Sequence, residues 1–132
     1  MTTLLLRIVA GTVGFMLLDG IWLGLLMKGF YQDHLAPIAR MANGGFDPNW
    51  PAALVVYLLL GAGIALFVAP RATGLASAAG YGALLGLVVY GVYDFTNFST
   101  LRAYPFVLTL VDLAWGITAS ALCSAFVRLV AR

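Results

Sequence analysis

Three aspartates lie within or beside long apolar runs of this 132-residue chain, which has five acidic residues and no glutamate. They are Asp19 in LLDGIWLG, Asp94 in YGVYDFTNFSTLRAYP and Asp112 in LTLVDLAWG. A charged residue at the centre of a membrane helix costs roughly 2.5–3.5 kcal/mol on insertion scales, so it normally faces the bundle interior and finds a partner there. We therefore treat the three carboxyl groups as candidates for acid–base chemistry, proton handling or ligand binding.

Hydrogen-bond donors stand about one helical turn from each aspartate, where side chains of the same helix face meet. These neighbours are Trp22, Tyr90, Asn97, Thr109 and Trp115. Arg102 follows the third apolar run and is the expected counter-charge, which would favour the ionised form of a carboxyl group. The predicted ligand-binding set is Asp19, Trp22, Tyr90, Asp94, Asn97, Arg102, Asp112 and Trp115.

The catalytic candidates are Asp94, Asp112 and His34, the one histidine of the chain. His34 would serve either as an interfacial side chain or as a general base acting with Asp33 or Asp94. A single histidine excludes the multi-histidine clusters of membrane di-iron oxygenases and two-histidine haem ligation within one chain. We expect no cofactor and no metal, although three carboxylates and Asn97 have the chemistry to hold a hard cation or to pass protons.

The composition requires these groups to be positioned by membrane helices. Hydrophobic residues make up 63% of the chain and charged residues 9%, and the mean hydropathy is +1.01. A soluble domain carries about 25% charged residues, so a bilayer is the expected solvent for most of the surface. The net charge of +2 comes from scattered Lys and Arg residues, which argues against nucleic-acid binding because that needs a basic face.

Four apolar runs are long enough to cross a bilayer as helices, since about 20 residues are needed. They cover about residues 4–27, 50–69, 75–97 and 105–127. Residues 29–41 predict a short interfacial helix interrupted by Pro37, and the next ten residues predict a turn that leads to Pro51 at the start of the second span. The predicted fold is all-α, a single polytopic domain of four transmembrane helices over residues 1–132.

Four spans place both termini on one side of the membrane and the three aspartates in the opposite half, where we expect them to line one polar pocket. The termini side collects four arginines against three basic residues on the other side, which favours cytoplasmic termini. The two sets are Arg7, Arg71, Arg128 and Arg132, and Lys28, Arg40 and Arg102. We interpret the aromatic residues of the non-terminal side, Tyr31, Trp50, Tyr93 and Tyr104, as an interface belt.

The motifs LLDGIWLG, GFYQDHL, NWPAALVVYLL, YGVYDFTNFSTLRAYP and LTLVDLAWG occur here in a fixed order and spacing. In this the chain resembles a family of small bacterial integral membrane proteins catalogued only as a domain of unknown function. The resemblance covers nearly the whole chain, from about Leu4 to Val127. It implies a four-span protein of the bacterial inner membrane and carries no accepted activity.

Our leading hypothesis is that the aspartate pocket binds or modifies a lipid-like or small amphiphilic substrate from the membrane. A small transporter, or a protein that handles protons or cations, is the first alternative. The second is an accessory subunit or homo-oligomer, in which a face containing Gly80, Gly82, Gly86 and Gly91 packs against a partner helix. The residues leave open whether the chain is an enzyme.

Overall fold

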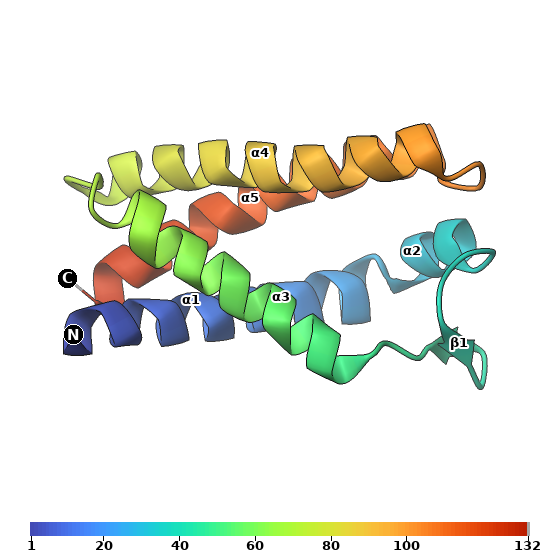
Figure 1. Ribbon diagram of the computed structural model, residues 1–132, viewed down its shortest axis with the longest axis horizontal. Coiled ribbons are helices and arrows are strands. Elements are labelled where there is room, and N and C mark those ends of the chain that lie inside the picture. The colour runs from blue at the N-terminus through green and yellow to red at the C-terminus, as the bar shows by residue number, and fades with distance from the viewer. Residues whose placement is uncertain (132) are drawn as a thin grey trace.

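The structure is a computed structural model that describes residues 1–131, and it is a bundle of long helices (Figure 1). Four helical segments are long and apolar enough to cross a membrane: Thr2–Leu26, Trp50–Val68, Leu75–Thr100 and Phe106–Val130. The all-α fold and the four predicted spans are therefore confirmed. The chain is a multi-pass membrane protein.

Two of the four spans change from α-helical to π-helical hydrogen bonding in their last turn. α1 (Thr2–Ile21) continues as η1 (Trp22–Leu26), and α3 (Trp50–Gly63) continues as η2 (Ile64–Val68). A π-helical turn holds more residues than an α-helical turn, so it rotates the side chains beyond it relative to those before it. In η1 this rotation falls directly after Asp19, the first of the candidate aspartates.

The other two spans, α4 (Leu75–Thr100) and α5 (Phe106–Val130), are uninterrupted α-helices. Each ends three residues beyond its predicted limit. At the end of α4 the hydroxyl groups of Ser99 and Thr100 donate to the carbonyl oxygen of Thr96, so these polar residues bond to the helix itself. A prediction based on apolar length stops too early at such residues.

The connection between the first two spans holds a short helix and a small hairpin. α2 (Lys28–Leu35) ends just before Pro37, which has no backbone N–H to continue the helical hydrogen bonds. It therefore covers only the first part of the predicted range 29–41. The predicted turn contains two paired strands, β1 (Met41–Ala42) and β2 (Gly45–Phe46), joined by Asn43 and Gly44 with positive φ angles of 50° and 77°. Such angles favour the Asn-Gly pair found here.

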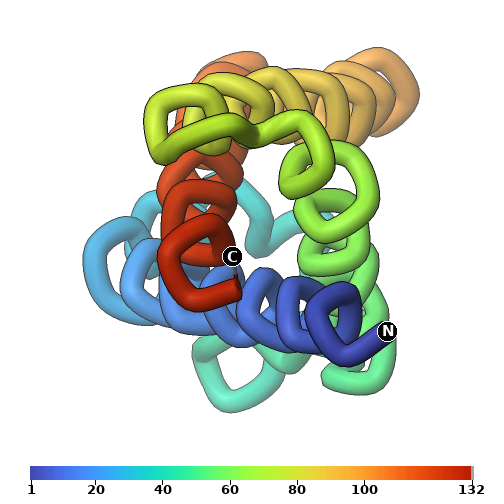
Figure 2. The backbone as a smooth tube through the Cα atoms, turned by 90° about the vertical axis from the view of Figure 1, so that its left-hand side faces the viewer, coloured from blue at the N-terminus to red at the C-terminus, as the bar shows by residue number. Residues whose placement is uncertain are grey.

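The bundle has two unlike ends. Both chain termini lie at one end, and α2 and the hairpin lie at the other (Figure 1). Seen from the termini, the four spans surround a common centre, with α3 on the side opposite α5 (Figure 2). Asn49 caps α3 by accepting from the backbone N–H of Ala52, and Pro51 occupies the first turn of α3 as predicted.

α4 and α5 pack backbone to backbone through small residues spaced four apart. On α4 these are Ala78, Gly82 and Gly86, and on α5 they are Gly116, Ser120 and Ser124. A Cβ atom on Gly86 would overlap with the carbonyl oxygen of Gly116, and one on Gly82 would meet the carbonyl oxygen of Ser120. Close approach at small residues is the usual way in which membrane helices associate.

This packing uses half of the glycine face that the accessory-subunit hypothesis assigned to a partner helix. Gly82 and Gly86 are buried against α5, whereas Gly80 faces open space and Gly91 lies 3.7 Å, measured from an added Cβ, from the Leu113 side chain. The four glycines therefore do not form one free face within residues 1–131.

An apolar layer fills the middle of the bundle and its termini half. Its buried members are Phe15, Leu60, Ile64, Val68, Ala119, Cys123 and Val127. Large hydrophobic side chains also point outward from every span, among them Leu17, Leu59 and Val92 at 63%, 67% and 66% exposed. An outer surface of this kind suits lipid contact.

We expect Gly86→Ala to destabilise the bundle because the added methyl group would meet the Gly116 carbonyl oxygen. Overpacking of this kind costs about 1–3 kcal/mol, partly offset by the better helix propensity of alanine, worth roughly 0.8–1 kcal/mol. Gly80→Ala is the matched control, because a Cβ atom there has open space. In SDS unfolding monitored by circular dichroism, the free energy of unfolding of Gly86→Ala should be lower than that of wild type. That of Gly80→Ala should be equal to or higher than that of wild type. Equal stabilities of the two variants would contradict the close α4–α5 contact.

Candidate functional site

Asp94 and Asp112 face each other at the end of the α4–α5 contact, as neighbouring carboxyl groups. Asp94 is fully buried, at 0% exposed, and its Oδ1 accepts a hydrogen bond of 2.6 Å from the hydroxyl group of Tyr104. Its Oδ2 has no hydrogen-bond partner among residues 1–131 when both carboxyl groups are ionised. The Asp112 carboxyl lies within hydrogen-bonding reach of Asp94. A proton held on either group would therefore give Asp94 Oδ2 the partner it lacks.

Tyr31 of α2 connects this pair to the non-terminal surface of the bundle. Its hydroxyl group donates to Asp112 Oδ1 at 2.6 Å and accepts from Trp22 Nε1 at 3.0 Å. Tyr31 is 4% exposed and packs with Tyr104 and Leu108 in a small apolar cluster. O–H···O distances of 2.5–2.7 Å are typical of hydrogen bonds to a charged acceptor. Two phenols thus hold the carboxyl pair from opposite sides.

Asp19 lies in a separate but adjoining network. Trp115 Nε1 donates to its Oδ1 at 2.8 Å, and Tyr57 of α3 lies nearby. The rings of Trp22 and Trp115 are stacked, with centroids 4.4 Å apart and an interplanar angle of 3°. This stack joins the Asp19 network to that of Asp112.

Neither tryptophan bonds to the carboxyl group that is nearest to it in the sequence. Trp22 was predicted to lie beside Asp19 and Trp115 beside Asp112, but Trp115 bonds to Asp19, and Trp22 reaches Asp112 through Tyr31. The π-helical turn begins at Trp22 and changes its register with Asp19. Each indole therefore helps to bond one helix to another.

The other predicted neighbours of the aspartates have local roles. Tyr90 lies over Gly116, where a Cβ atom would overlap with its ring, and packs against the apolar layer. Asn97 lies one turn beyond Tyr93 on α4, and the two side chains are neighbours. Thr109 is fully buried, and its hydroxyl group lies 3.5 Å from the carbonyl oxygen of Pro105.

His34 and Arg102 are not brought to the carboxyl groups. His34 Nδ1 lies 2.8 Å from the carbonyl oxygen of Phe30, and its ring centroid is 4.3 Å from that of Phe30. Arg102 is exposed in the turn before α5, and the hydrogen bonds to the aspartates within residues 1–131 come from tyrosine and tryptophan. Neutral donors take the place of the counter-charge expected from the sequence.

Two members of the predicted aromatic belt belong to the site instead. Tyr31 and Tyr104 are 4% and 5% exposed, whereas Trp50 and Tyr93 are 70% and 58% exposed. A buried tyrosine usually finds a hydrogen-bond partner for its hydroxyl group. The sequence signal that could have assigned these two tyrosines to the site was their position, since Tyr104 follows Asp94 across a tight turn and Tyr31 lies in the amphipathic connection.

The described residues do not form a ready-made cation site. Hard cations require several oxygen ligands, six to eight for Ca²⁺. No group of three metal-ligating side chains forms within residues 1–131. Moreover, Tyr31 and Tyr104 point donor hydrogens at the carboxylate oxygens that a cation would need. The cation alternative therefore lacks a preformed site in this part of the chain.

Residues 4–129 match the model of a family described as "Predicted membrane protein (DUF2177)". The chain belongs to this family. The match extends over all four spans of this DUF2177 protein and includes the three aspartates, Tyr31 and Tyr104. Neither the curated proteins nor the solved structures contain a match to the DUF2177 chain.

The two phenols that bind the pair lie outside the spans, and both have raised pKa values. Burial is the largest cause for each. The pKa of Tyr31 is raised further by the Asp112 charge and hydrogen bond, and that of Tyr104 by its hydrogen bond to Asp94 and the charge of that carboxyl group. An unfolded tyrosine ionises near pH 10, so above that pH the unfolded chain releases protons that the folded chain keeps. Stability must then fall as the pH rises, by about 1.4 kcal/mol per pH unit for each such tyrosine.

We expect the free energy of unfolding in SDS to decrease from pH 10 to pH 12 in wild type, and to decrease less steeply in Tyr104→Phe. Phenylalanine has no proton to release, so its contribution to the slope disappears. Tyr81→Phe is the control, because Tyr81 is 42% exposed on the outer face of α4. A Tyr104→Phe slope equal to that of wild type would show that Tyr104 ionises alike in the folded and unfolded states.

Proposed function

We propose that this DUF2177 protein is a proton-binding membrane protein in which Asp94 and Asp112 hold one exchangeable proton between them. The observation that carries the proposal is the Asp94 carboxyl group, which has a buried and unpartnered oxygen, Oδ2, and has the Asp112 carboxyl group as a neighbour. Two ionised carboxylates in this position would repel each other in a low-dielectric interior, and one shared proton removes that repulsion.

The surroundings of the pair suit the binding of a proton better than the binding of a larger ligand. Asp94 has no exposed surface, Asp112 is partly buried, and each carboxyl group accepts a hydrogen bond from a phenol. Tyr31 is the hydrogen-bonded residue that connects Asp112 to α2 at the non-terminal end. We infer that the proton exchanges on that side.

The transport alternative requires a path through the rest of the bundle. Between the carboxyl groups and the termini lies the apolar layer, with the fully buried side chains of Phe15, Ile64 and Val127. All five acidic residues of the chain belong to the non-terminal half or its loops. Proton binding from one side thus accounts for the arrangement, and a relay across one protomer would need groups that this layer lacks.

Infrared spectroscopy of the protein in lipid, titrated with pH, tests the proposal. We expect wild type to show the C=O stretching band of a protonated carboxyl group, which disappears as the pH rises. Asp94→Asn and Asp112→Asn should each abolish that band or shift its titration, because each removes one of the two groups that share the proton. Asp33→Asn, at an exposed residue of α2, is the control and should leave the band unchanged.

Two infrared results would contradict the proposal. A spectrum without a protonated carboxyl band at any pH at which the protein is folded would overturn the proposal. So would a band that persists unchanged in both Asp94→Asn and Asp112→Asn, since it would then belong to another group, with Asp19 the first to test.

Lipid or amphiphile binding is a second proposal, favoured by a groove on the lipid-facing side of α1 and α5. The groove has a volume of about 230 Å³ and is lined by Gly14, Leu17, Leu18, Leu122, Cys123 and Phe126. It ends one residue before Asp19, which is hydrogen-bonded to Trp115 from α5. An acyl chain in this groove would bring its polar end towards the Asp19 network.

Lipid mass spectrometry of the host cells tests this second proposal. We expect a lipid species that is lost on deletion of the gene and restored by wild type, but not by an equally expressed Asp19→Asn variant. Asp33→Asn is again the control and should restore the species. Identical lipid profiles in all these strains would exclude a role of the protein in lipid handling.

We also propose that the protein lies in the bacterial inner membrane with its termini in the cytoplasm. Arg7 in α1 and Arg128 in α5 lie near the chain termini, and Arg71 follows η2, which contacts both of these helices. Lys28 begins α2, Arg40 comes just before β1, and Arg102 lies in the turn before α5. The fourth arginine of the predicted termini set, Arg132, lies outside the described residues. The positive-inside bias, counted from sequence, supports this orientation.

A further inference from the structure

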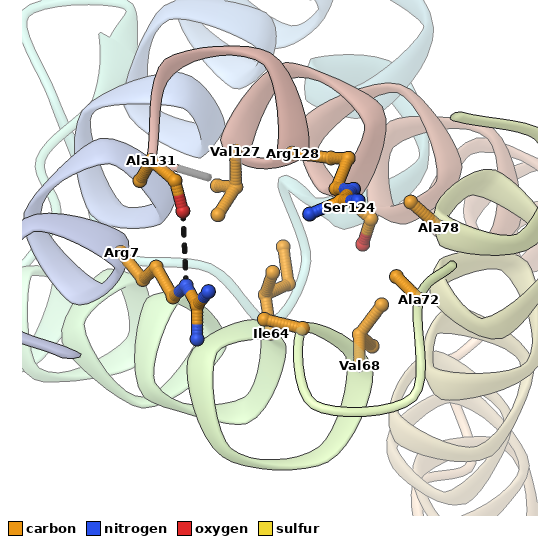
Figure 3. Close-up of a pocket in the computed structure, with 10 residues that line it drawn as sticks. Arg7, Ile64, Val68, Ala72, Ala78, Ser124, Val127, Arg128 and Ala131 are labelled. Atoms are coloured by element: carbon orange, nitrogen blue, oxygen red, sulfur yellow. Dashed lines mark hydrogen bonds between the residues drawn. The ribbon is translucent and has the colours of Figure 1, made fainter. Parts of the chain in front are cut away.

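A small hollow lies at the termini end of the bundle, between α1, η2 and α5 and far from the carboxyl pair (Figure 3). Its volume is about 10 Å³, which is room for one water molecule. Apolar side chains such as Ile64 and Val68 form much of its wall. The polar groups around it are Arg7, Ser124 and Arg128.

Two guanidinium groups face this hollow from different helices (Figure 3). Arg7 Nε donates to the carbonyl oxygen of Ala131 at 3.0 Å, and Arg128 Nη2 lies 3.4 Å from the carbonyl oxygen of Thr73. Each guanidinium group has five N–H donors, so most of these donors remain for another acceptor. None of the residues that line the hollow is acidic.

Ser124 adds a buried hydroxyl group that has no hydrogen-bond partner within residues 1–131. Its side chain is 2% exposed, and it lies beside Arg128 and points towards the hollow (Figure 3). A buried hydroxyl group without a partner destabilises the folded state. A water molecule in the hollow would supply the missing partner and would itself need further polar contacts.

We propose that Arg7 and Arg128 form a binding site for a phosphate group, carried by an anionic membrane lipid at this face of the bundle. Arginine binds phosphate through paired N–H donors, and basic sites between transmembrane helices bind anionic headgroups. The hollow is too small for a phosphate, so the phosphate lies at its mouth, and the single water connects it to Ser124. α1 begins and α5 ends here, which puts both arginines near the level of the headgroups.

Native mass spectrometry of the detergent-solubilised full chain tests this site. Phosphatidylglycerol is titrated against phosphatidylcholine, and inorganic phosphate is titrated separately. We expect wild type to bind one phosphatidylglycerol about tenfold or more tightly than phosphatidylcholine, and Arg128→Gln to lose most of this preference, since a hydrogen bond to a charged group is worth about one factor of ten or more.

Arg71→Gln is the matched control, because it removes the same charge from the same end of the bundle. Arg71 is exposed in the turn after η2, donates to the carbonyl oxygen of Phe67 and does not line the hollow, so the preference should persist. If Arg71→Gln and Arg128→Gln lost the preference for phosphatidylglycerol equally, the effect would come from general surface charge, and the proposed site would be wrong. Equal affinity of wild type for the two lipids would also overturn the proposal. Inorganic phosphate that binds with the same dependence on Arg128 would support the phosphate site and assign it to a soluble phosphate.

Discussion

The backbone contact between α4 and α5 is the constraint on which the rest of the bundle depends. Each step of four residues along α4 is matched by a step of four back along α5, so that Gly86 lies against Gly116 and Ser120, and Tyr90 lies over Gly116. One more step brings Asp94 to Asp112. The glycines therefore do more than permit close packing, because they set the register that places two carboxyl groups side by side in the membrane interior.

The bundle divides into layers with different physical character. At the non-terminal end, phenol and indole donors from η1, α2, α5 and the turn before α5 hold the carboxyl groups without a basic side chain. In the middle, apolar side chains predominate, and the buried polar side chains there are uncharged hydroxyl groups such as those of Thr12 and Ser120. At the termini end, two arginines lie near the surface without an acidic neighbour among the residues of their hollow. The acidic groups are thus confined to the non-terminal half, whereas basic residues lie at both ends of the bundle.

Much of the fold can be predicted from the sequence, because apolar length alone limits the chain to four spans, and helix direction alone puts all three aspartates in one half. The partners of the aspartates cannot be predicted in the same way. Neighbours three or four positions apart suggested donors on the same helix, but Trp22 and Trp115 act between helices. In the sequence, Tyr31 and Tyr104 resemble residues of an aromatic interface belt. Only the tertiary fold shows that their hydroxyl groups point inward, towards the carboxyl groups. The π-helical turn at Trp22, which alters the register, has no clear signal in the sequence.

The four-residue spacing of the α4–α5 contact also restricts how this chain can vary over evolutionary time. Because Gly82 meets Ser120 and Ser124, and Gly86 meets Gly116 and Ser120, a larger residue on one helix is tolerated only with a smaller one on the other. Substitutions at these positions should therefore be correlated among homologues, in pairs that run in opposite directions along the chain. The same coupling links these small residues to the acidic pair, since a shift of α4 along α5 that accommodates one large side chain would also separate Asp94 from Asp112.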